Sequence, residues 1–304
     1  MNTLRVSKNI LSKSGLAHTL LMGFFGISLL LGGCKTDKST SVNDSDSIAT
    51  EEPIAIEQLK FDSIGYTKTD TITDVSIIFD YPQGTSRLAD SVKAFINRQI
   101  CANSLPEYVD DKTIYPALYK GNPTSKALVN YYGKLFTKRL QKENRENPDI
   151  PHEDSKYLLT VSIKEHEQTD KYINFDVNSE CFLMGAHGSF TSYNVVIDKM
   201  NGKEVQILDT TKVKEMQKLL IDGVYSYFKE NGENFKKSNI WDYLMLEKKT
   251  IPLPVHQPSL TKDGLSFVYQ QYEIAAYACG LPCFTIPYAK VKKYMTEEAR
   301  KLIE

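Results

Sequence analysis

The sequence lacks an excess of basic residues, and this bounds the partners it can have. Its 37 Lys and Arg residues face 38 Asp and Glu residues, which gives a net charge of −1 over 304 residues. Nucleic-acid binding favours a clustered basic face, so we expect no nucleic-acid partner. The chain is 41% hydrophobic. About 250 residues remain beyond the N-terminal segment, enough for one large or two small domains.

Residues that hold metals or carry redox chemistry are also scarce. The chain has five cysteines and five histidines, no CxxC pair, and only His187 near a cysteine. A structural zinc site takes about four convergent ligands. There is also no GxSxG motif, which marks the nucleophile of many serine hydrolases. We therefore expect no metal and no cofactor.

The N-terminal apolar run, from Leu20 to Leu31, is too short to span a membrane as a helix. It follows a basic leader that contains no acidic residue and ends in Leu31-Gly32-Gly33-Cys34. Such a leader is typical of a secretory signal peptide. The last four residues resemble the lipobox of bacterial lipoproteins, in which the cysteine is acylated, for example with palmitate. The alternative is an ordinary signal peptide with a chance cysteine.

The lipobox implies a signal peptide at residues 1–33 and lipidation of Cys34. Residues 34–55 are rich in Ser, Thr, Asp and Lys and have no aromatic residue. Such a segment cannot offset its ordering entropy, so we predict a flexible tether with a reach of about 25 Å. We expect a bacterial envelope protein that is anchored to a membrane, most simply the outer membrane. Its body would lie in the periplasm or on the cell surface.

Hydrophobic periodicity in the body predicts strands and separate amphipathic helices. The segregation favours an α+β fold with mainly antiparallel sheets, packed helices and two subdomains. Expected strands cover 71–81, 157–163, 173–177, 193–197 and 205–208, and expected helices cover 88–100, 128–140, 211–228 and 288–303. Between the second and third strands, Glu165, His166 and Glu167 could form an acid–base cluster. A solvated hairpin turn over 164–171 is the simpler interpretation, since neighbours along a strand point to opposite faces.

The stretch from Phe267 to Tyr288 concentrates aromatic side chains, Glu273 and two cysteines. Phe267, Tyr269 and Tyr272 are expected in the core or sheet, because aromatic rings dominate packing. Tyr277, between alanines, is the better candidate for a contact surface.

Four cysteines lie in the body, and an envelope location permits disulfides. Cys279 and Cys283 could bridge across Gly-Leu-Pro, pair with Cys101 or Cys181, or remain reduced. A redox-active pair is the alternative; it is disfavoured by the lack of a CxxC at a helix start.

Several of these motifs, in this order, resemble the RsiV-like domain of lysozyme-sensing anti-sigma factors and of a peptidoglycan deacetylase. The matching segments are Gly185 to Gly188, Tyr193 to Ile197, Asn201 to Lys203, Leu265 to Phe267, Tyr272 to Ala275, Tyr277, Gly280 and Ile286-Pro287. Residues from about Phe61 to Cys181 resemble the PdaC-like domain that commonly precedes it. The chain departs from the family pattern at Ala276, where proline is frequent, and at Cys279 and Cys283.

The resemblance implies an N-terminal domain at 56–182 and an RsiV-like domain at 183–304. In the anti-sigma factor the corresponding region binds lysozyme, and in the deacetylase the chemistry belongs to a separate domain with an Asp-Asp and histidine motif absent here. We therefore expect a non-enzymatic binding module for a protein or glycan, with lysozyme or peptidoglycan as the most concrete ligands. Candidate ligand-binding residues are His187, Tyr272, Glu273 and Tyr277.

Two other functions remain open. His187 and Glu273 could form the acid–base pair of an envelope glycan hydrolase if the fold brings them together. Against this, Gly185 and Gly188 are typical of a tight turn, in which His187 would bond to backbone. The chain could also be a structural lipoprotein that contacts other envelope proteins.

Overall fold

The computed structural model describes residues 57–104, 117–148, 155–232 and 235–304. These residues belong to one compact unit, Pro53–Glu304. The expected signal peptide, the expected lipidation site at Cys34 and the expected tether all lie outside the described residues. Within the described part, no helix is long and apolar enough to cross a membrane.

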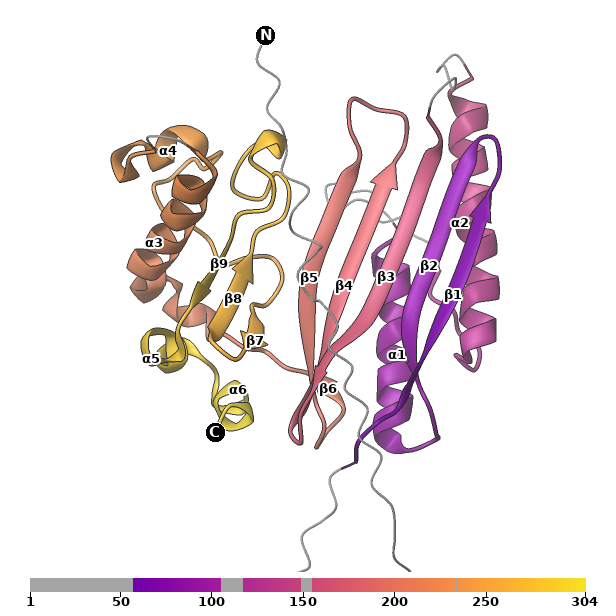
Figure 1. Ribbon diagram of the computed structural model, residues 1–304, viewed down its shortest axis with the longest axis horizontal. Helices are drawn as coiled ribbons and strands as arrows, with labels where there is room; N and C mark the ends of the chain where they lie inside the picture. Colours follow the sequence, from indigo (N-terminus) through magenta and orange to yellow (C-terminus); the bar gives the residue numbers. More distant parts are fainter. Residues whose placement is uncertain (1–56, 105–116, 149–154, 233–234) are drawn as a thin grey trace, which may run out of the picture. The chain divides into compact units, whose positions relative to one another are not determined.

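A six-stranded sheet forms the first part of the fold (Figure 1). Neighbouring strands are antiparallel except β2 and β3, which run parallel. A parallel pair needs a long crossover connection, and two helices supply it here. In spatial order the strands are β1 (Phe61–Thr69), β2 (Thr73–Pro82), β3 (Tyr157–Gln168), β4 (Tyr172–Phe182), β5 (Ser189–Asp198) and β6 (Lys203–Glu204); the helices are α1 (Arg87–Ala102) and α2 (Ser125–Glu146).

Both crossover helices lie on the same face of this sheet (Figure 1). Each starts at a hydroxyl residue that accepts from a backbone N–H three positions on: Ser86 for α1 and Thr124 for α2. Such caps satisfy amide groups that the first turn leaves unpaired. The apolar positions of β3, which alternate along the strand, face the helices and are buried. The period-two and helical patterns of the sequence therefore build the first hydrophobic core.

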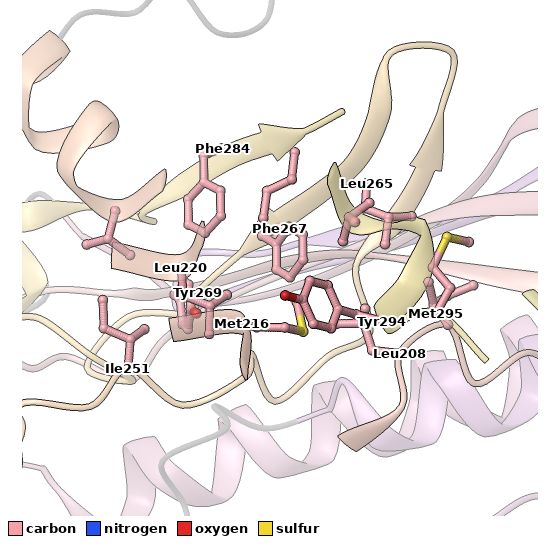
Figure 2. Packing of buried hydrophobic residues seen from close by; sticks show 14 of the residues in the cluster. Leu208, Met216, Leu220, Ile251, Leu265, Phe267, Tyr269, Phe284, Tyr294 and Met295 are labelled. Carbon is pink, nitrogen blue, oxygen red and sulfur yellow. The ribbon is translucent and has the colours of Figure 1, made fainter. Parts of the chain in front are cut away.

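A second core is built by the C-terminal third of the chain. The three-stranded antiparallel sheet β7–β8–β9 packs against α3, and Phe267 stacks on Phe284 with ring centroids 5.2 Å apart (Figure 2). Short helices complete this part. The elements are α3 (Val213–Asn231), α4 (Ile240–Tyr243), β7 (Ser259–Thr261), β8 (Gly264–Val268), β9 (Cys283–Ile286), α5 (Tyr288–Val291) and α6 (Glu297–Leu302).

The architecture is α+β, as the sequence predicts, and two hydrophobic cores are present. The boundary expected between residues 182 and 183 lies within the large sheet. It falls between β4 and β5, which pair over ten residues from Cys181↔Ser189 to Tyr172↔Asp198. The second core instead gathers residues from Val205 onward, together with Tyr172 and Val196 of the large sheet. The division between cores thus lies after β6.

Three sequence-based elements differ from the structure. The strand over 157–163 continues to Gln168, so Glu165 to Glu167 lie in β3, at a bulge, and the turn is shorter than expected. The helix expected over 288–303 is divided, because Thr296 interrupts it and caps α6 through its side chain. In place of the return strand expected at 205–208, the paired strand is Lys203–Glu204, followed by one bond from the Val205 N–H to the Val196 carbonyl and an isolated bridge between Leu208 and Met295.

Candidate functional site

The imidazole of His187, between β4 and β5, is held by two hydrogen bonds. Its Nδ1 lies 2.9 Å from the carbonyl oxygen of Gly188, and its Nε2 lies 2.9 Å from the hydroxyl oxygen of Tyr272. A carbonyl can only accept, so Nδ1 carries the proton. In the tautomer protonated only at Nδ1, Nε2 accepts from the Tyr272 hydroxyl. The side chain is exposed, yet its ring orientation is fixed at both ends.

Tyr277 completes this group of rings. The His187 ring stacks on Tyr277 with centroids 3.7 Å apart and an interplanar angle of 20°, while Tyr272 lies 6.1 Å from Tyr277 and 6.0 Å from His187. We call His187, Tyr272 and Tyr277 the aromatic cluster. It joins the β4–β5 loop of the large sheet to the β8–β9 loop of the small one.

Two glutamines fix the β8–β9 loop against the edge of β5. The buried side chain of Gln270 accepts from the Ser192 N–H and donates to the Ser192 carbonyl, each at 3.0 Å. Gln271 accepts from the Phe190 N–H at 3.0 Å. Because β6 and Val205 bond only to the Val196–Asp198 end of β5, the edge at Phe190 and Ser192 would otherwise lack such partners among the described residues. The glutamine amides take the place of a neighbouring strand.

Glu273 organises the same loop from within. Its Oε1 accepts from the Val255 N–H and its Oε2 from the Gln270 N–H, both at 2.7 Å. A carboxylate bonded to two backbone amides is a strong local brace. Glu273 thus adjoins the aromatic cluster in sequence, but its two oxygens are directed at backbone, and the ring nitrogens of His187 bond elsewhere.

The backbone at Tyr272 is strained. Its φ is +65°, in the left-handed region that costs a bulky L-residue about 1–2 kcal/mol. Its side chain is 42% exposed, so packing in the core does not account for this backbone conformation. This corrects the expectation that Tyr272 packs inside, whereas Phe267 and Tyr269 are fully buried as predicted. Strain held at an exposed ring is common at binding sites.

Exposed apolar side chains surround the loop. Phe190, Met245 and Val255 are 40%, 61% and 64% exposed. Each belongs to a segment hydrogen-bonded to the loop: Met245 N–H donates to the Ile274 carbonyl at 2.8 Å, while Phe190 and Val255 bond to Gln271 and Glu273. We call these three side chains the apolar rim. Gathered exposed apolar side chains are typical of interaction surfaces.

The fold therefore brings three of the four sequence-predicted ligand residues into mutual contact, with Glu273 beside them as a brace. The apolar rim and the two glutamines were not predicted. Met245 and Val255 come from a polar, proline-containing connection with no periodicity, so the pattern alone could not mark them. The one signal that the sequence offers is an apolar residue within a polar connection.

The four body cysteines remain thiols, and within the described residues no disulfide joins them. A bridge between Cys279 and Cys283, one of the alternatives left open by the sequence, is therefore not formed in this structure. Burial raises the pKa of Cys101 and Cys279, and raises that of Cys181 to about 12. Raised pKa values oppose thiolate formation and hence redox catalysis at these three residues.

The C-terminal end of β3, which carries Glu165, His166 and Glu167, forms a polar cluster separate from the aromatic cluster. His166 Nδ1 lies 3.1 Å from an Asp176 carboxylate oxygen, across to β4. Burial, followed by the nearby Asp80 carboxylate, raises the pKa of Glu165. Among the described residues, no cluster of three or more His, Cys, Asp or Glu is arranged to hold a metal ion.

One known protein family matches part of the chain. Residues 211–289 carry a DUF3298 domain, described as "Protein of unknown function". The DUF3298 segment runs from the start of α3 past β9, so it contains the entire β8–β9 loop with Tyr272, Glu273 and Tyr277, and leaves His187 outside. A comparison with curated proteins gives no match.

Two solved DUF3298 structures share the fold. A family member from Bacteroides fragilis is 19% identical with a TM-score of 0.58, and covers 80% of this chain and 96% of its own. A DUF3298 protein from Pseudomonas aeruginosa PAO1 is 14% identical with a TM-score of 0.56, and covers 80% of this chain and 95% of its own. The likeness extends well beyond the DUF3298 segment and includes most of the described fold.

Proposed function

We propose that the protein is a lipid-anchored module of the bacterial envelope that binds a protein or glycan ligand at the aromatic cluster. The observation that carries the proposal is the bond between His187 and Tyr272. It fixes two loops from different sheets around an exposed, strained tyrosine. Pre-organised rings of this kind lose little conformational entropy when a ligand covers them.

The geometry favours binding over catalysis. A general base needs a ring nitrogen or carboxylate oxygen within reach of the substrate proton. Both nitrogens of His187 bond to Gly188 and Tyr272, and both oxygens of Glu273 bond to backbone amides. The hydrolase alternative would require the Nε2 of His187 to release the Tyr272 hydroxyl before the ring could act as a base.

The apolar rim favours a protein ligand over a glycan. Aromatic rings serve both classes, but exposed Met and Val side chains gain by burial against an apolar surface at about 25 cal/mol per Å². The resemblance to the RsiV-like domain supports a muramidase of the lysozyme type as that protein. Peptidoglycan is the glycan alternative, and it would engage the rings without the rim.

Calorimetric titration of the chain from residue 35 onward, which retains both cores, tests this proposal. We expect saturable binding of lysozyme or of soluble muropeptides. Lack of binding to both would contradict the proposal. Turnover of peptidoglycan that is abolished by both His187→Ala and Glu273→Gln would instead establish the hydrolase alternative.

The lipid anchor rests on Leu31-Gly32-Gly33-Cys34. It would keep the body at the membrane surface, on the periplasmic or outer side, where both proposed ligands occur. The RsiV-like and PdaC-like domain assignments belong to this proposal as well, since they place the aromatic cluster in the region that binds lysozyme in the anti-sigma factor.

A further inference from the structure

The C-terminal segment forms an open groove that is separate from the aromatic cluster. The groove has a volume of about 590 Å³ and is lined by residues of α5, of the segment between α5 and α6, and of α6, together with Glu304. Four cationic side chains and two carboxylates line it. These residues are Lys292, Lys293, Arg300, Lys301, Glu297 and Glu304, together with Ala289.

Two of the four cations are neutralised within the groove. Lys292 pairs with Glu304 and Lys301 pairs with Glu297, each at 2.8 Å. These attractions lower the pKa of both carboxyl groups, so both stay ionised near neutral pH. The carboxylates of the groove therefore already have partners.

The other two cations lack such partners. Lys293 and Arg300 have no carboxylate within ion-pair distance among the described residues, and the ammonium of Lys293 lies 4.8 Å from the centre of the Tyr294 ring. Counted over its side chains, the groove thus carries two more positive than negative charges, and Arg300 is also close enough to lower the pKa of Glu297 and of Glu304.

Two further lysines contact the groove-forming segment from neighbouring elements. Lys171, at the β3–β4 turn, donates to the Lys301 carbonyl at 2.9 Å, and Lys212 donates to the Lys293 carbonyl at 3.2 Å. Lys212 also pairs with Asp209 at 3.3 Å. Both ammonium groups therefore sit on the backbone of the groove-forming segment, where they offset the negative ends of its carbonyl dipoles.

We propose that this groove binds the phosphate of an anionic lipid headgroup. Phosphate oxygens accept from Lys as a point charge and from Arg in a forked geometry, so Lys293 and Arg300 form a matched pair of donors. An open groove with an exposed Lys293 and a partly exposed Arg300 suits a membrane surface better than a free phosphate ion, which requires enclosed donors to displace its water. The site would hold one face of the body against the bilayer, independently of the ligand bound at the aromatic cluster.

Vesicle co-sedimentation tests the proposal. The chain from residue 35 onward is mixed with vesicles of phosphatidylcholine alone or of equal parts phosphatidylcholine and phosphatidylglycerol. We expect binding to the anionic vesicles only, weakened by added salt because exposed charges are screened beyond about 10 Å at 0.1 M. Binding to neither type, or equally to both, would overturn the proposal.

A double variant locates the site. Each cation near an anionic surface contributes about fivefold to binding, so Lys293→Ala with Arg300→Ala should weaken binding on the order of twentyfold. The matched control, Lys248→Ala with Lys249→Ala, removes two exposed charges elsewhere and should change it little. Equal losses in both variants would show non-specific attraction and contradict the site.

A titration with inorganic phosphate distinguishes a lipid headgroup from a free phosphate ion as the ligand. We expect the NMR signals of the Lys293 and Arg300 side chains to shift with anionic vesicles and not with inorganic phosphate at the same phosphate concentration. Saturation by inorganic phosphate alone would assign the groove to a free anion and overturn the lipid assignment. Because lysozyme and muropeptide titrations contain no lipid, failure here is distinct from failure of the proposed function.

Discussion

The Nε2 atom of His187 lies 2.9 Å from the hydroxyl oxygen of Tyr272, although 85 positions separate the two residues in sequence. This bond, with the stack of His187 on Tyr277, ties the loop after β4 to the loop after β8. It turns a glycine-flanked turn and an aromatic-rich loop into one exposed surface. The proposed binding function depends on that junction.

Replacement of Tyr272 separates function from stability. Tyr272→Asn removes the ring but keeps a residue that tolerates the left-handed region. Loss of an exposed hydrogen bond, about 0.5–1.5 kcal/mol, should be offset by relief of about 1–2 kcal/mol of backbone strain. We expect the free energy of unfolding in urea to stay within about 1 kcal/mol of wild type. A much larger loss would mean that Tyr272 is a structural residue.

The glutamine contacts with β5 should differ in strength. Gln270→Ala leaves the N–H and carbonyl of Ser192 without partners in a largely buried place, which should cost about 1–3 kcal/mol of unfolding free energy. Gln271→Ala removes one bond at an exposed position and should cost less. Urea unfolding of both variants checks the order. Equal effects would contradict the role assigned to Gln270.

Gly223 marks the close approach of α3 to β9. A Cβ at this position would collide with the Phe284 ring. Gly223→Ala should therefore destabilise by about 1–3 kcal/mol, even though alanine favours a helix by about 1 kcal/mol. Lys218→Ala, on the exposed side of α3, is the control and should stay within about 0.5 kcal/mol. Stabilisation by Gly223→Ala would contradict the packing described.

Asp70 should contribute to the loss of folding stability at acidic pH. The N–H groups of Ile72 and Thr73 donate to its carboxylate and hold its pKa below the ordinary value of 3.8. A lowered pKa in the folded state stabilises the fold above the unfolded-state value, and this contribution is lost as the pH falls through the folded-state value. Asp70→Asn should reduce the decline in stability below about pH 4. Unfolding curves at several acidic pH values measure it; an unchanged slope would count against this carboxylate.

The anchoring prediction concerns Cys34. Cys34→Ser should release the protein from the membrane fraction of its host, because acyl chains contribute about 0.8 kcal/mol per buried methylene. Fractionation of cells that express each form measures this directly. Persistent membrane association of the variant, resistant to high salt, would refute the lipobox interpretation.

Regular patterns made much of the fold predictable. Apolar residues alternate along β3 and recur at helical spacing along α1 and α2. Both repeats can be read directly from the sequence. Edge strand β1 was not predicted, because its burial is slight and irregular. The last helix was predicted as one element, since its helical composition conceals the capping of α6 by Thr296.

The candidate site was only partly predictable for a different reason. The residue types at His187 and Tyr277 suggested a surface, and a family resemblance pointed to the same segments. Their contact depends on how two sheets meet, which no local pattern encodes. The same holds for Gln270, whose polar side chain is buried only because β5 offers an unpaired edge there.

The most direct test compares the wild-type chain with Tyr272→Asn in titrations with lysozyme and with muropeptides. Met200→Ala is the matched control, since Met200 is 86% exposed and follows the opposite end of β5 from Phe190. We predict that wild type and Met200→Ala bind the same ligand equally and that Tyr272→Asn binds it at least about tenfold more weakly, as expected for a central contact residue. Equal binding by all three proteins, or by none, would contradict the assignment of the binding site to the aromatic cluster.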